Sequence, residues 1–257
     1  MGDRPPQLKK TIRLDALLVE RGLAASRERA RALVLAGNVL VDGHVQSKAG
    51  TPVKPDAALS LVMPDHPYVG RGGLKLAHAL ETFAIDPSGR LALDIGASTG
   101  GFTDVLLQRG ASRVVALDVG HGQLDWRLRN DPRVIVLERI NARTLTPSDL
   151  PEDARQFTIV TIDVSFISLR QILPVVPPLL APGADVILLV KPQFEAGRDE
   201  VGKGGIVRDA DVRARVVDEV TNAALALGLT RASGTPSPIT GMEGNEEYLL
   251  HLQWPYE

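Results

Sequence analysis

The segment that most constrains the possible folds of this chain is a glycine-rich turn within residues 91–104, LALDIGASTGGFTD. An apolar run containing Asp94 comes first, glycines follow at positions 96, 100 and 101, and a helical pattern then begins. Such a turn at the end of a parallel strand brings the backbone close to a ligand, which the N-terminus of the next helix also faces. The glycine spacing is not the GxGxxG of dinucleotide-binding proteins. The segment therefore predicts a nucleotide-type ligand at the edge of a parallel sheet.

Strand and helix patterns alternate from this turn to the end of the chain, which predicts an α/β fold with a doubly wound parallel sheet. The chain has 257 residues, enough for one or two domains and a sizeable core. Strands are expected at residues 91–95, 113–119, 134–138, 157–163, 185–191 and 248–254. Helices are expected at residues 101–109, 123–129, 169–180 and 211–227.

The first sixty residues carry a separate pattern of two short helices and a hairpin. Residues 13–22 and 26–37 each place apolar side chains on one helical face. Residues 38–45 predict a hairpin with an Asp-Gly turn, and a further strand is expected at 58–63. The Pro- and Gly-rich residues 64–73 then predict a linker.

Composition and charge exclude several classes of protein. The absence of cysteine removes disulfides, thiolate metal sites and cysteine nucleophiles, including the chemistry of 5-methylpyrimidine formation in RNA. The five histidines lack metal-ligand spacing, so no metal is expected. The N-terminus resembles no signal peptide and no apolar run reaches membrane-spanning length, so we expect a cytoplasmic protein without a membrane partner. Residues 1–66 hold 10 Lys and Arg against 7 Asp and Glu, which favours an anionic partner there.

Residues 13–43, RLDALLVERGLAASRERARALVLAGNVLVDG, resemble the αL-type RNA-binding domain of a small-subunit ribosomal protein, pseudouridine synthases and tyrosyl-tRNA synthetases. Within this pattern three arginines gather at the start of the second helix, where guanidinium groups can bind phosphates. No aromatic residue precedes Tyr68, so we expect recognition of folded RNA by shape and phosphate and no base stacking. The expected RNA-contacting residues are Arg13, Arg21, Arg27, Arg29, Arg31, Lys48 and, in a glycine-rich loop at 197–207, Lys203.

Four polar residues stand at the ends of expected strands or face them, and they are Lys75, Asp163, Lys191 and Glu247. On a parallel sheet, Asp163 and Lys191 would open onto the same crevice, and Lys75 at the start of a helix could fold over it. Glu246 and Glu247 both open the last strand. Because neighbouring strand residues point to opposite faces, one of them enters the crevice, and we favour Glu247.

The order Lys–Asp–Lys–Glu resembles the ribose 2′-O-methyltransferases of the FtsJ-like class, and the glycine turn resembles the first motif of class I S-adenosylmethionine methyltransferases. With the αL-type unit in front, residues 13–252 resemble the TlyA (hemolysin A-like) family of ribosomal RNA (cytidine-2′-O)-methyltransferases, also through IDVSFISL, VKPQFEAG, VGKGGIVRD and EGNEEYLLHL. The resemblance implies a small α+β αL-type RNA-binding domain in residues 1–63, a linker at 64–73 and a class I methyltransferase domain of Rossmann-like type in residues 74–257. It also implies S-adenosyl-L-methionine as cofactor, ribosomal RNA within ribosomal subunits as partner, and a protein that is a monomer when free.

The chemistry of the reaction explains these residue types. A ribose 2′-hydroxyl is a poor nucleophile at neutral pH and needs a base or a hydrogen-bond acceptor. A lysine can serve if burial and a second cation lower its pKa. We therefore hypothesise that Lys191 is the base, that Lys75 lies nearby, and that Asp163 and Glu247 orient the ammonium groups and the hydroxyl.

For the cofactor, we expect the glycine turn to surround the methionine moiety, and Asp118 to accept hydrogen bonds from the ribose hydroxyls. Asn141 and Asp163 are weaker candidates near the adenine. The complete set of expected cofactor contacts is Asp94, Gly96, Ala97, Ser98, Thr99, Gly100, Gly101, Phe102, Asp118, Val119, Asn141 and Asp163.

Three other functions stay open on the sequence. Enzymes that methylate an exocyclic base amine usually carry an Asn/Asp-Pro-Pro-aromatic segment after the fourth strand, whereas residues 163–166 read DVSF. The name hemolysin suggests a membrane-acting protein, but no long apolar stretch or basic amphipathic helix supports it. A non-enzymatic RNA chaperone or ribosome assembly factor would share the fold. The presence of all four polar residues and the glycine turn favours an enzyme.

Overall fold

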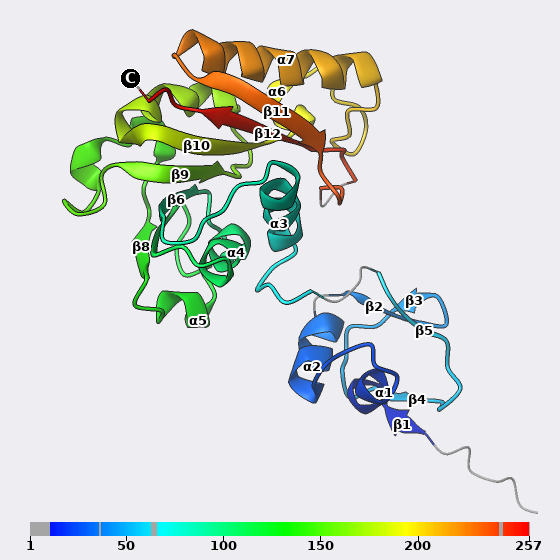
Figure 1. Ribbon diagram of the computed structural model, residues 1–257. Helices are drawn as coiled ribbons and strands as arrows, with labels where there is room; N and C mark the ends of the chain where they lie inside the picture. The colour runs from blue at the N-terminus through cyan, green and yellow to red at the C-terminus, as the bar shows by residue number, and fades with distance from the viewer. Residues whose placement is uncertain (1–10, 36, 63–65, 242–243, 257) are drawn as a thin grey trace, which may run out of the picture. The chain divides into compact units, whose positions relative to one another are not determined.

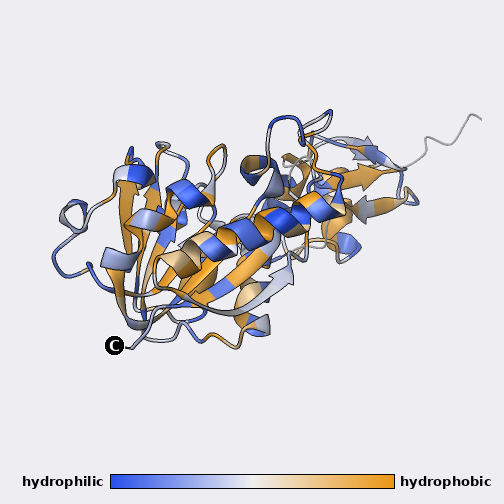
Figure 2. Cartoon of the chain, turned by 90° about the horizontal axis from the view of Figure 1, so that it is seen from above, coloured by the Kyte–Doolittle hydropathy of each residue, from blue (hydrophilic) through white to orange (hydrophobic). Residues whose placement is uncertain are grey.

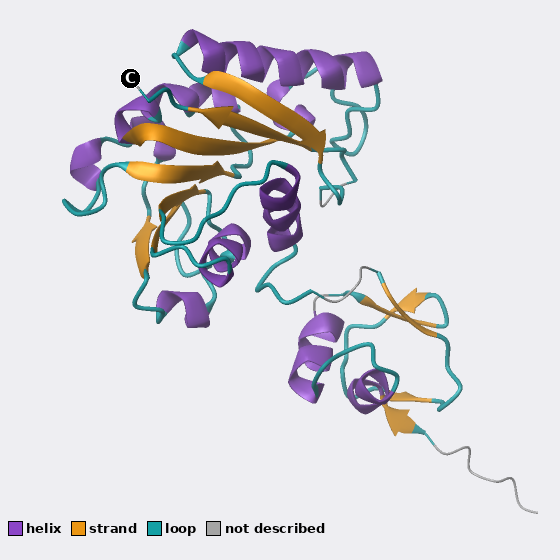
Figure 3. Cartoon of the chain, viewed as in Figure 1, coloured by secondary structure: helices purple, strands orange, loops and turns teal. Residues whose placement is uncertain are grey.

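The computed structural model describes residues 11–35, 37–62, 66–241 and 244–256, and the chain divides into two compact units. The first unit is Met1–Pro67 and the second is Tyr68–Glu257. Figure 1 shows both units, and Figure 3 shows that each contains helices and strands.

The first unit consists of two short helices, a two-stranded sheet and a three-stranded sheet with the order β3-β2-β5. Its elements are β1 (Ile12–Arg13), α1 (Leu14–Glu20), α2 (Arg27–Leu35), β2 (Val39–Val41), β3 (His44–Val45), β4 (Pro52–Val53) and β5 (Leu59–Leu61). The predicted hairpin is confirmed as β2 and β3, and its turn residues Asp42 and Gly43 have φ of 51° and 81°. Positive φ at both central residues matches the right-handed twist of a hairpin, and Asp-Gly adopts it readily. The apolar faces of α1 and α2 pack into one core with Val39.

The second unit is built on a seven-stranded sheet with the order β11-β12-β10-β9-β6-β7-β8. Its strands are β6 (Leu91–Ile95), β7 (Arg113–Asp118), β8 (Val134–Glu138), β9 (Phe157–Ile162), β10 (Leu180–Val190), β11 (Thr230–Pro236) and β12 (Tyr248–Gln253). Its α-helices are α3 (Gly72–Thr82), α4 (Gly101–Gln108), α5 (Trp126–Arg129), α6 (Pro192–Glu195) and α7 (Ala210–Ala226). Short 3₁₀ helices are η1 (Ala142–Thr144), η2 (Pro147–Asp149), η3 (Leu169–Gln171), η4 (Leu173–Val175) and η5 (Pro177–Leu179).

Helices cover both faces of this sheet, because successive strand residues point to opposite sides. Leu93 on β6 packs in one core with Val220 of α7 and with the 3₁₀ helices, whereas Ala92 packs in a second core with Leu76 of α3 and Leu106 of α4. Figure 2 shows the apolar strands and, along α7, alternating polar and apolar residues. The doubly wound α/β class predicted from the sequence is thereby confirmed.

The sheet is mixed, so the expectation of a parallel sheet is wrong for β12. β12 pairs antiparallel with both β10 and β11. The helix α7 provides the long crossover that a parallel strand requires, but the connection from β11 to β12 contains no helix and returns as an antiparallel pair. β11 is absent from the sequence-based prediction because TRASGTP is polar and contains glycine, as an edge strand can be.

The helix expected at residues 169–180 is also wrong, because the structure has η3, η4 and η5 there. Prolines at 174, 177 and 178 lack the backbone N–H that a continuous α-helix needs, and their rings clash with the preceding turn. The chain therefore crosses this face of the sheet in three tight turns.

The linker expected at residues 64–73 is shorter in the structure. Residues 63–65 lie outside the described part of the chain, whereas Tyr68 onward groups with the second unit and α3 already begins at Gly72. The N–H of Val69 donates to Asp104 on α4 at 2.8 Å. Gly73 packs directly against Tyr68, where a β-carbon would not fit. These local contacts hold the segment to the larger unit.

Candidate active site

Two adjoining cavities open where the parallel strands end. The first, of about 520 Å³, lies over the ends of β6, β7 and β9, and the second, of about 440 Å³, extends toward α3, α6 and β12. The residues that line both are Gly96, Ser98, Asp163, Ser165 and Phe166. The chain runs from β6 outward through β7 and β8 and then returns to β9 on the other side of β6. The cavities thus lie at the switch point where open α/β sheets bind ligands.

Gly96 has to be glycine, because the chain turns there directly over the end of β9. Its φ is +86°, and a β-carbon would collide with the backbone carbonyl of Asp163. The N–H of Asp163 donates to the carbonyl of Ile95 at 2.9 Å, which joins the ends of β6 and β9. The turn therefore keeps the backbone at the floor of both cavities.

Asp94 lies beneath this turn and is fully buried. Its two carboxylate oxygens accept hydrogen bonds from the hydroxyls of Thr103, at 2.6 Å, and Thr161, at 2.9 Å. Burial raises the pKa of the Asp94 carboxyl to about 6, against the lowering effect of these hydrogen bonds. The carboxylate thus ties α4 and β9 to the end of β6.

Among the described residues, most of the expected cofactor contacts line a cavity. Those on the first are Gly96, Ser98, Asp118, Val119, Asn141 and Asp163. Those on the second are Gly96, Ala97, Ser98, Thr99, Gly101, Phe102 and Asp163. Asp94 and Gly100 line neither cavity, so the structure does not support them as direct contacts. Asp94 is covered by the turn, and Gly100, with φ of +97°, faces Leu124 and Leu128.

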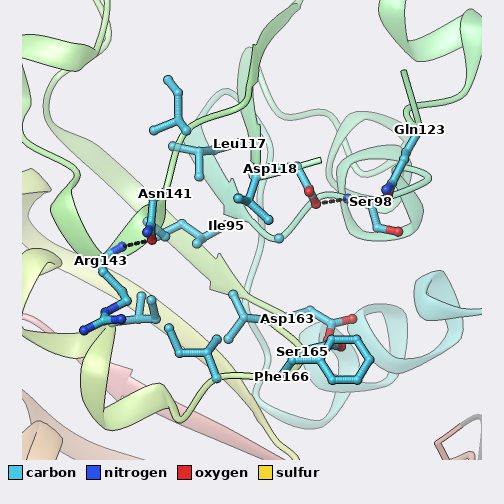
Figure 4. A pocket seen from close by; sticks show the side chains of 17 residues that line it. Ile95, Ser98, Leu117, Asp118, Gln123, Asn141, Arg143, Asp163, Ser165 and Phe166 are labelled. Carbon is cyan, nitrogen blue, oxygen red and sulfur yellow. Dashed lines mark hydrogen bonds between the residues drawn. The ribbon is translucent and has the colours of Figure 1, made fainter. Parts of the chain in front are cut away.

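Asp118 lines the first cavity and binds the backbone of the loops around it. Its carboxylate accepts from the N–H groups of Ser98, at 2.8 Å, and Gly120, at 2.6 Å. Figure 4 shows the bond to Ser98 and, across the cavity, Asn141, whose side-chain oxygen accepts from the N–H of Arg143. Both side chains therefore shape the loops after their strands and still line the cavity.

All four residues singled out for chemistry line the second cavity, as two ion pairs. The ammonium of Lys75 donates to the carboxylate of Glu247, and both side chains are buried. The Nζ atom of Lys191 lies 2.6 Å from Oδ1 of Asp163 and donates to Oγ of Ser165 at 2.9 Å. Each buried ammonium therefore has a counter-charge, which a charged group needs away from water.

The choice between the two glutamates is decided by burial. Glu247 is 3% exposed and faces the cavity, whereas the side chain of Glu246 is 60% exposed and pairs with Arg213 at 3.2 Å. Asn245, in the same segment, accepts from the N–H of Val207 and donates to the carbonyl of Gly205. The glycine-rich loop that carries Lys203 is thus anchored beside Glu247, and Lys203 itself is exposed.

Sequence reasoning missed two aromatic residues at the cavities. Phe166 is 91% exposed, has φ of +64° and lines both cavities, and its ring lies 5.2 Å from that of Phe194. Positive φ is unfavourable for a bulky side chain, so the surrounding structure enforces this position. One signal could have found both: each phenylalanine follows a site residue by three positions, in D-x-x-F and K-x-x-F.

The basic residues of the first unit differ in what their side chains contact. Arg27 and Arg31, one helical turn apart, both contact Asp15, as does Arg13. Arg29 points elsewhere, because residues two positions apart do not share a helix face, and it donates to the carbonyl of His66 at 2.7 Å. Arg21 donates to the carbonyl of Pro55 at 2.6 Å, and Lys48 is exposed.

No group of three or more His, Asp or Glu side chains is placed to hold a metal ion within residues 11–35, 37–62, 66–241 and 244–256. Over the same ranges, no helix has the length and apolar character needed to cross a membrane.

The fold is that of the class I methyltransferases. It is defined by the glycine turn, by the acids at the ends of the strands and by the mixed seven-stranded sheet. A solved S-adenosylmethionine-dependent methyltransferase from Mesorhizobium loti has this fold, with a TM-score of 0.53 at 16% identity over 72% of this chain and 100% of that one. The chain belongs to the FtsJ-like methyltransferase family, whose model matches residues 68–254, and it carries an S4 domain at residues 12–59.

Several relatives match nearly the full length of the chain. The chain is 49% identical to the 16S/23S rRNA (cytidine-2′-O)-methyltransferase TlyA of Mycobacterium tuberculosis, over 96% of this chain and 91% of the relative. A solved structure of a hemolysin-named protein from Streptococcus thermophilus has a TM-score of 0.75 at 43% identity, covering 96% of this chain and 90% of that one. The predicted family is therefore confirmed.

Proposed function

We propose that this protein transfers a methyl group from S-adenosylmethionine to the ribose 2′-hydroxyl of a cytidine in ribosomal RNA. The observation that carries the proposal is the meeting of two lysines and two carboxylates in one cavity beside the glycine turn. A methyltransferase fold, an S4 domain and a relative named for this reaction support it. Such a substrate would place its work in the cytoplasm, on ribosomal subunits.

The first cavity fits S-adenosylmethionine by size and by its donor set. Its volume of about 520 Å³ is typical of small-molecule sites. A carboxylate has about four acceptor positions, so Asp118 keeps capacity for a ribose diol beyond its two backbone contacts. Leu117, Ile140 and Ile172 offer an apolar lining for an adenine ring. When bound, the cofactor supplies a methyl group activated by its sulfonium.

In the second cavity, Lys191 and Asp163 act on the 2′-hydroxyl as a pair. Asp163 and Ser165 fix Nζ of Lys191, which leaves a third position on the nitrogen for the ribose oxygen. When Nζ passes one of its protons to Asp163, rotation of the amine about its bond to the side chain turns the freed lone pair toward the hydroxyl, and Nζ then takes the proton of that hydroxyl. The pair thus ends with one added proton, and no free base is required. The Lys75–Glu247 pair closes the other side of the cavity and orients the sugar.

The test is methylation of purified ribosomal subunits with the full-length protein and radiolabelled S-adenosylmethionine, followed by mapping of 2′-O-methylated nucleotides. We expect label on a cytidine ribose. Label on a base nitrogen or carbon would contradict the proposed chemistry. Binding of the cofactor by calorimetry without transfer to any subunit would favour the assembly-factor interpretation, and leakage of dye from liposomes would favour a membrane activity.

Phe166 is expected to stack on the nucleobase whose ribose enters the second cavity. A nucleotide within folded RNA has to leave its stack to reach an enzyme, and an exposed aromatic ring replaces the lost stacking. Stacking on a protein aromatic is worth about 1–3 kcal/mol per base, so we expect Phe166→Ala to lower kcat/KM for ribosomal subunits by about 10- to 100-fold. Steady-state methylation kinetics measure this.

Two further variants make the Phe166 test specific. Phe166→Tyr keeps the ring and should keep most of the activity. Tyr256→Ala removes another exposed aromatic side chain, one that lines neither cavity, and should change little. If Phe166→Ala methylates subunits as well as Tyr256→Ala does, Phe166 does not hold the base.

A further inference from the structure

Three arginines of the first unit gather around one buried aspartate. Asp15, on α1, is 0% exposed, and its carboxylate accepts from Nε and Nη2 of Arg13 at 3.1 and 2.8 Å. Nη2 of Arg27 lies 3.2 Å from Oδ1 of Asp15, and Nε of Arg31 lies 3.2 Å from Oδ2. We refer to Asp15, Arg13, Arg27 and Arg31 as the Asp15 cluster. It carries one negative and three positive charges, so its net charge is +2.

The arginines of the Asp15 cluster remain open to solvent even though their aspartate is not. Their side chains are 52%, 55% and 57% exposed. Each guanidinium has five N–H donors, and the contacts with Asp15 use one or two of them. One carboxylate therefore holds three guanidinium groups in place. Most of the N–H donors of these groups are not used by Asp15.

The surrounding backbone fixes the same cluster. The N–H of Asp15 donates to the carbonyl of Ala49 at 3.0 Å, and a β-carbon on Gly50 would lie 3.2 Å from Nη1 of Arg13. The loop that carries Lys48 is therefore attached where the three guanidinium groups gather. Hydrogen bonds from Arg13, acting against burial, hold the pKa of the Asp15 carboxyl well below its usual range. Asp15 thus keeps its charge, and its arginines keep their anchor, at any physiological pH.

We propose that Asp15 is a positioning residue that pre-arranges Arg13, Arg27 and Arg31 as one clamp for phosphate groups of folded RNA. This inference rests on the proposed function. An unanchored arginine loses rotamer freedom when it binds, at a cost in affinity for each side chain. Because Asp15 already fixes the three arginine side chains when the unit folds, they lose little further rotamer freedom when they bind phosphates. Its guanidinium forks suit phosphate oxygens better than point charges do.

The proposal makes a prediction opposite to that of simple electrostatics. Asp15→Asn removes one negative charge and so raises the net charge of the unit by one, and charge alone therefore predicts tighter binding of RNA. An asparagine amide, however, is neutral and keeps only one acceptor oxygen, so its NH2 group faces guanidinium donors that it cannot bind and the arginines lose part of their anchor. We expect the variant to bind ribosomal subunits about tenfold more weakly, as measured by filter binding at fixed salt. In methylation assays KM should rise by a similar factor while kcat stays within about twofold, because ground-state binding alone is lost.

Asp42→Asn is the matched control. It adds the same charge to the same unit, Asn suits the positive φ of position 42, and the amide oxygen can still accept from the N–H of Ala58. We expect its affinity for subunits to be unchanged or slightly higher. Arg31→Lys keeps the charge but cannot reproduce the fork, and we expect about threefold weaker binding. This second variant tests the clamp even if Asp15→Asn fails to fold.

The outcomes separate the two proposals. If Asp15→Asn binds subunits as tightly as Asp42→Asn, or Arg31→Lys binds as wild type does, the clamp is wrong and the proposed function stands. If the wild-type protein neither binds nor methylates subunits, the proposed function fails before the variants are compared.

Discussion

Lys191→Ala is expected to lower kcat for methylation of ribosomal subunits by about 10²- to 10⁴-fold, the usual contribution of a positioned proton-transfer group. The variant removes the nitrogen that Asp163 and Ser165 hold in the second cavity. S-adenosylmethionine affinity should remain within a few-fold of wild type, because the residues that we propose for the cofactor lie on the glycine turn and the first cavity. Single-turnover kinetics and calorimetry measure the two quantities.

The control for Lys191→Ala is Lys54→Ala, which truncates an exposed lysine of the first unit. It should methylate subunits nearly as wild type does. Full activity of Lys191→Ala with the cofactor still bound would remove Lys191 from the mechanism. Loss of cofactor binding in the variant would instead assign Lys191 to the cofactor site.

Asp94→Asn is expected to stabilise the second unit at neutral pH by about 3 kcal/mol. The pKa of the Asp94 carboxyl is about 6 in the folded protein and 3.8 for an ordinary aspartate, so folding binds a proton between these pH values. The contribution of the Asp94 carboxyl to the free energy of unfolding is fully present below about pH 3.8 and is lost as the pH rises through 6. An asparagine stays neutral at every pH, so it does not lose this contribution. The hydroxyls of Thr103 and Thr161 can each donate or accept a hydrogen bond, so both can bind the amide.

The sign of the Asp94 effect is tested by urea unfolding at two pH values. Both tryptophans, Trp126 and Trp254, lie in the second unit, so their fluorescence reports on it. The advantage of Asp94→Asn should shrink from about 3 kcal/mol at pH 7.5 to about 1 kcal/mol at pH 4.5. An advantage that is equal at both pH values, or a destabilised variant at pH 7.5, would contradict the argument.

A second buried acid provides the contrast. Burial acts to raise the pKa of the Asp185 carboxyl. Hydrogen bonds with His251 and Arg90 outweigh burial and lower this pKa below its ordinary value. Asp185→Asn should therefore destabilise the unit at neutral pH. That the chain keeps a buried carboxylate at Asp94, held by two hydroxyls, fits a functional use, since a negative charge beneath the turn favours a cationic cofactor in the cavities above it.

Local sequence signals were enough for the main architecture. The glycine turn, the acids near the ends of β6, β7 and β9 and the Asp-Gly hairpin depend on neighbours in the chain, and the structure has all three. Two local signals misled the prediction. Apolar spacing suggested a helix at 169–180 although three prolines forbid it, and the polar sequence of β11 concealed an edge strand.

The sequence predicts that two lysines and two carboxylates share one crevice, but it does not say which lysine pairs with which carboxylate. Lys75 and Glu247 are 172 positions apart, yet they form one buried pair. Asp15 looked like an ordinary polar residue of a helix, and only folding makes it the anchor of three arginines. Nothing in the periodicity of α1 distinguishes an exposed aspartate from a buried one that is fully paired.

The sequence by itself determined the two units, the fold class and which side chains stand at the ends of strands, because turn chemistry and hydrophobic period act over a few residues. The tertiary structure alone decided which ammonium meets which carboxylate and that Phe166 stands exposed at the edge of two cavities. Those outcomes depend on burial and on contacts between distant segments, which become defined only when the strands pack side by side.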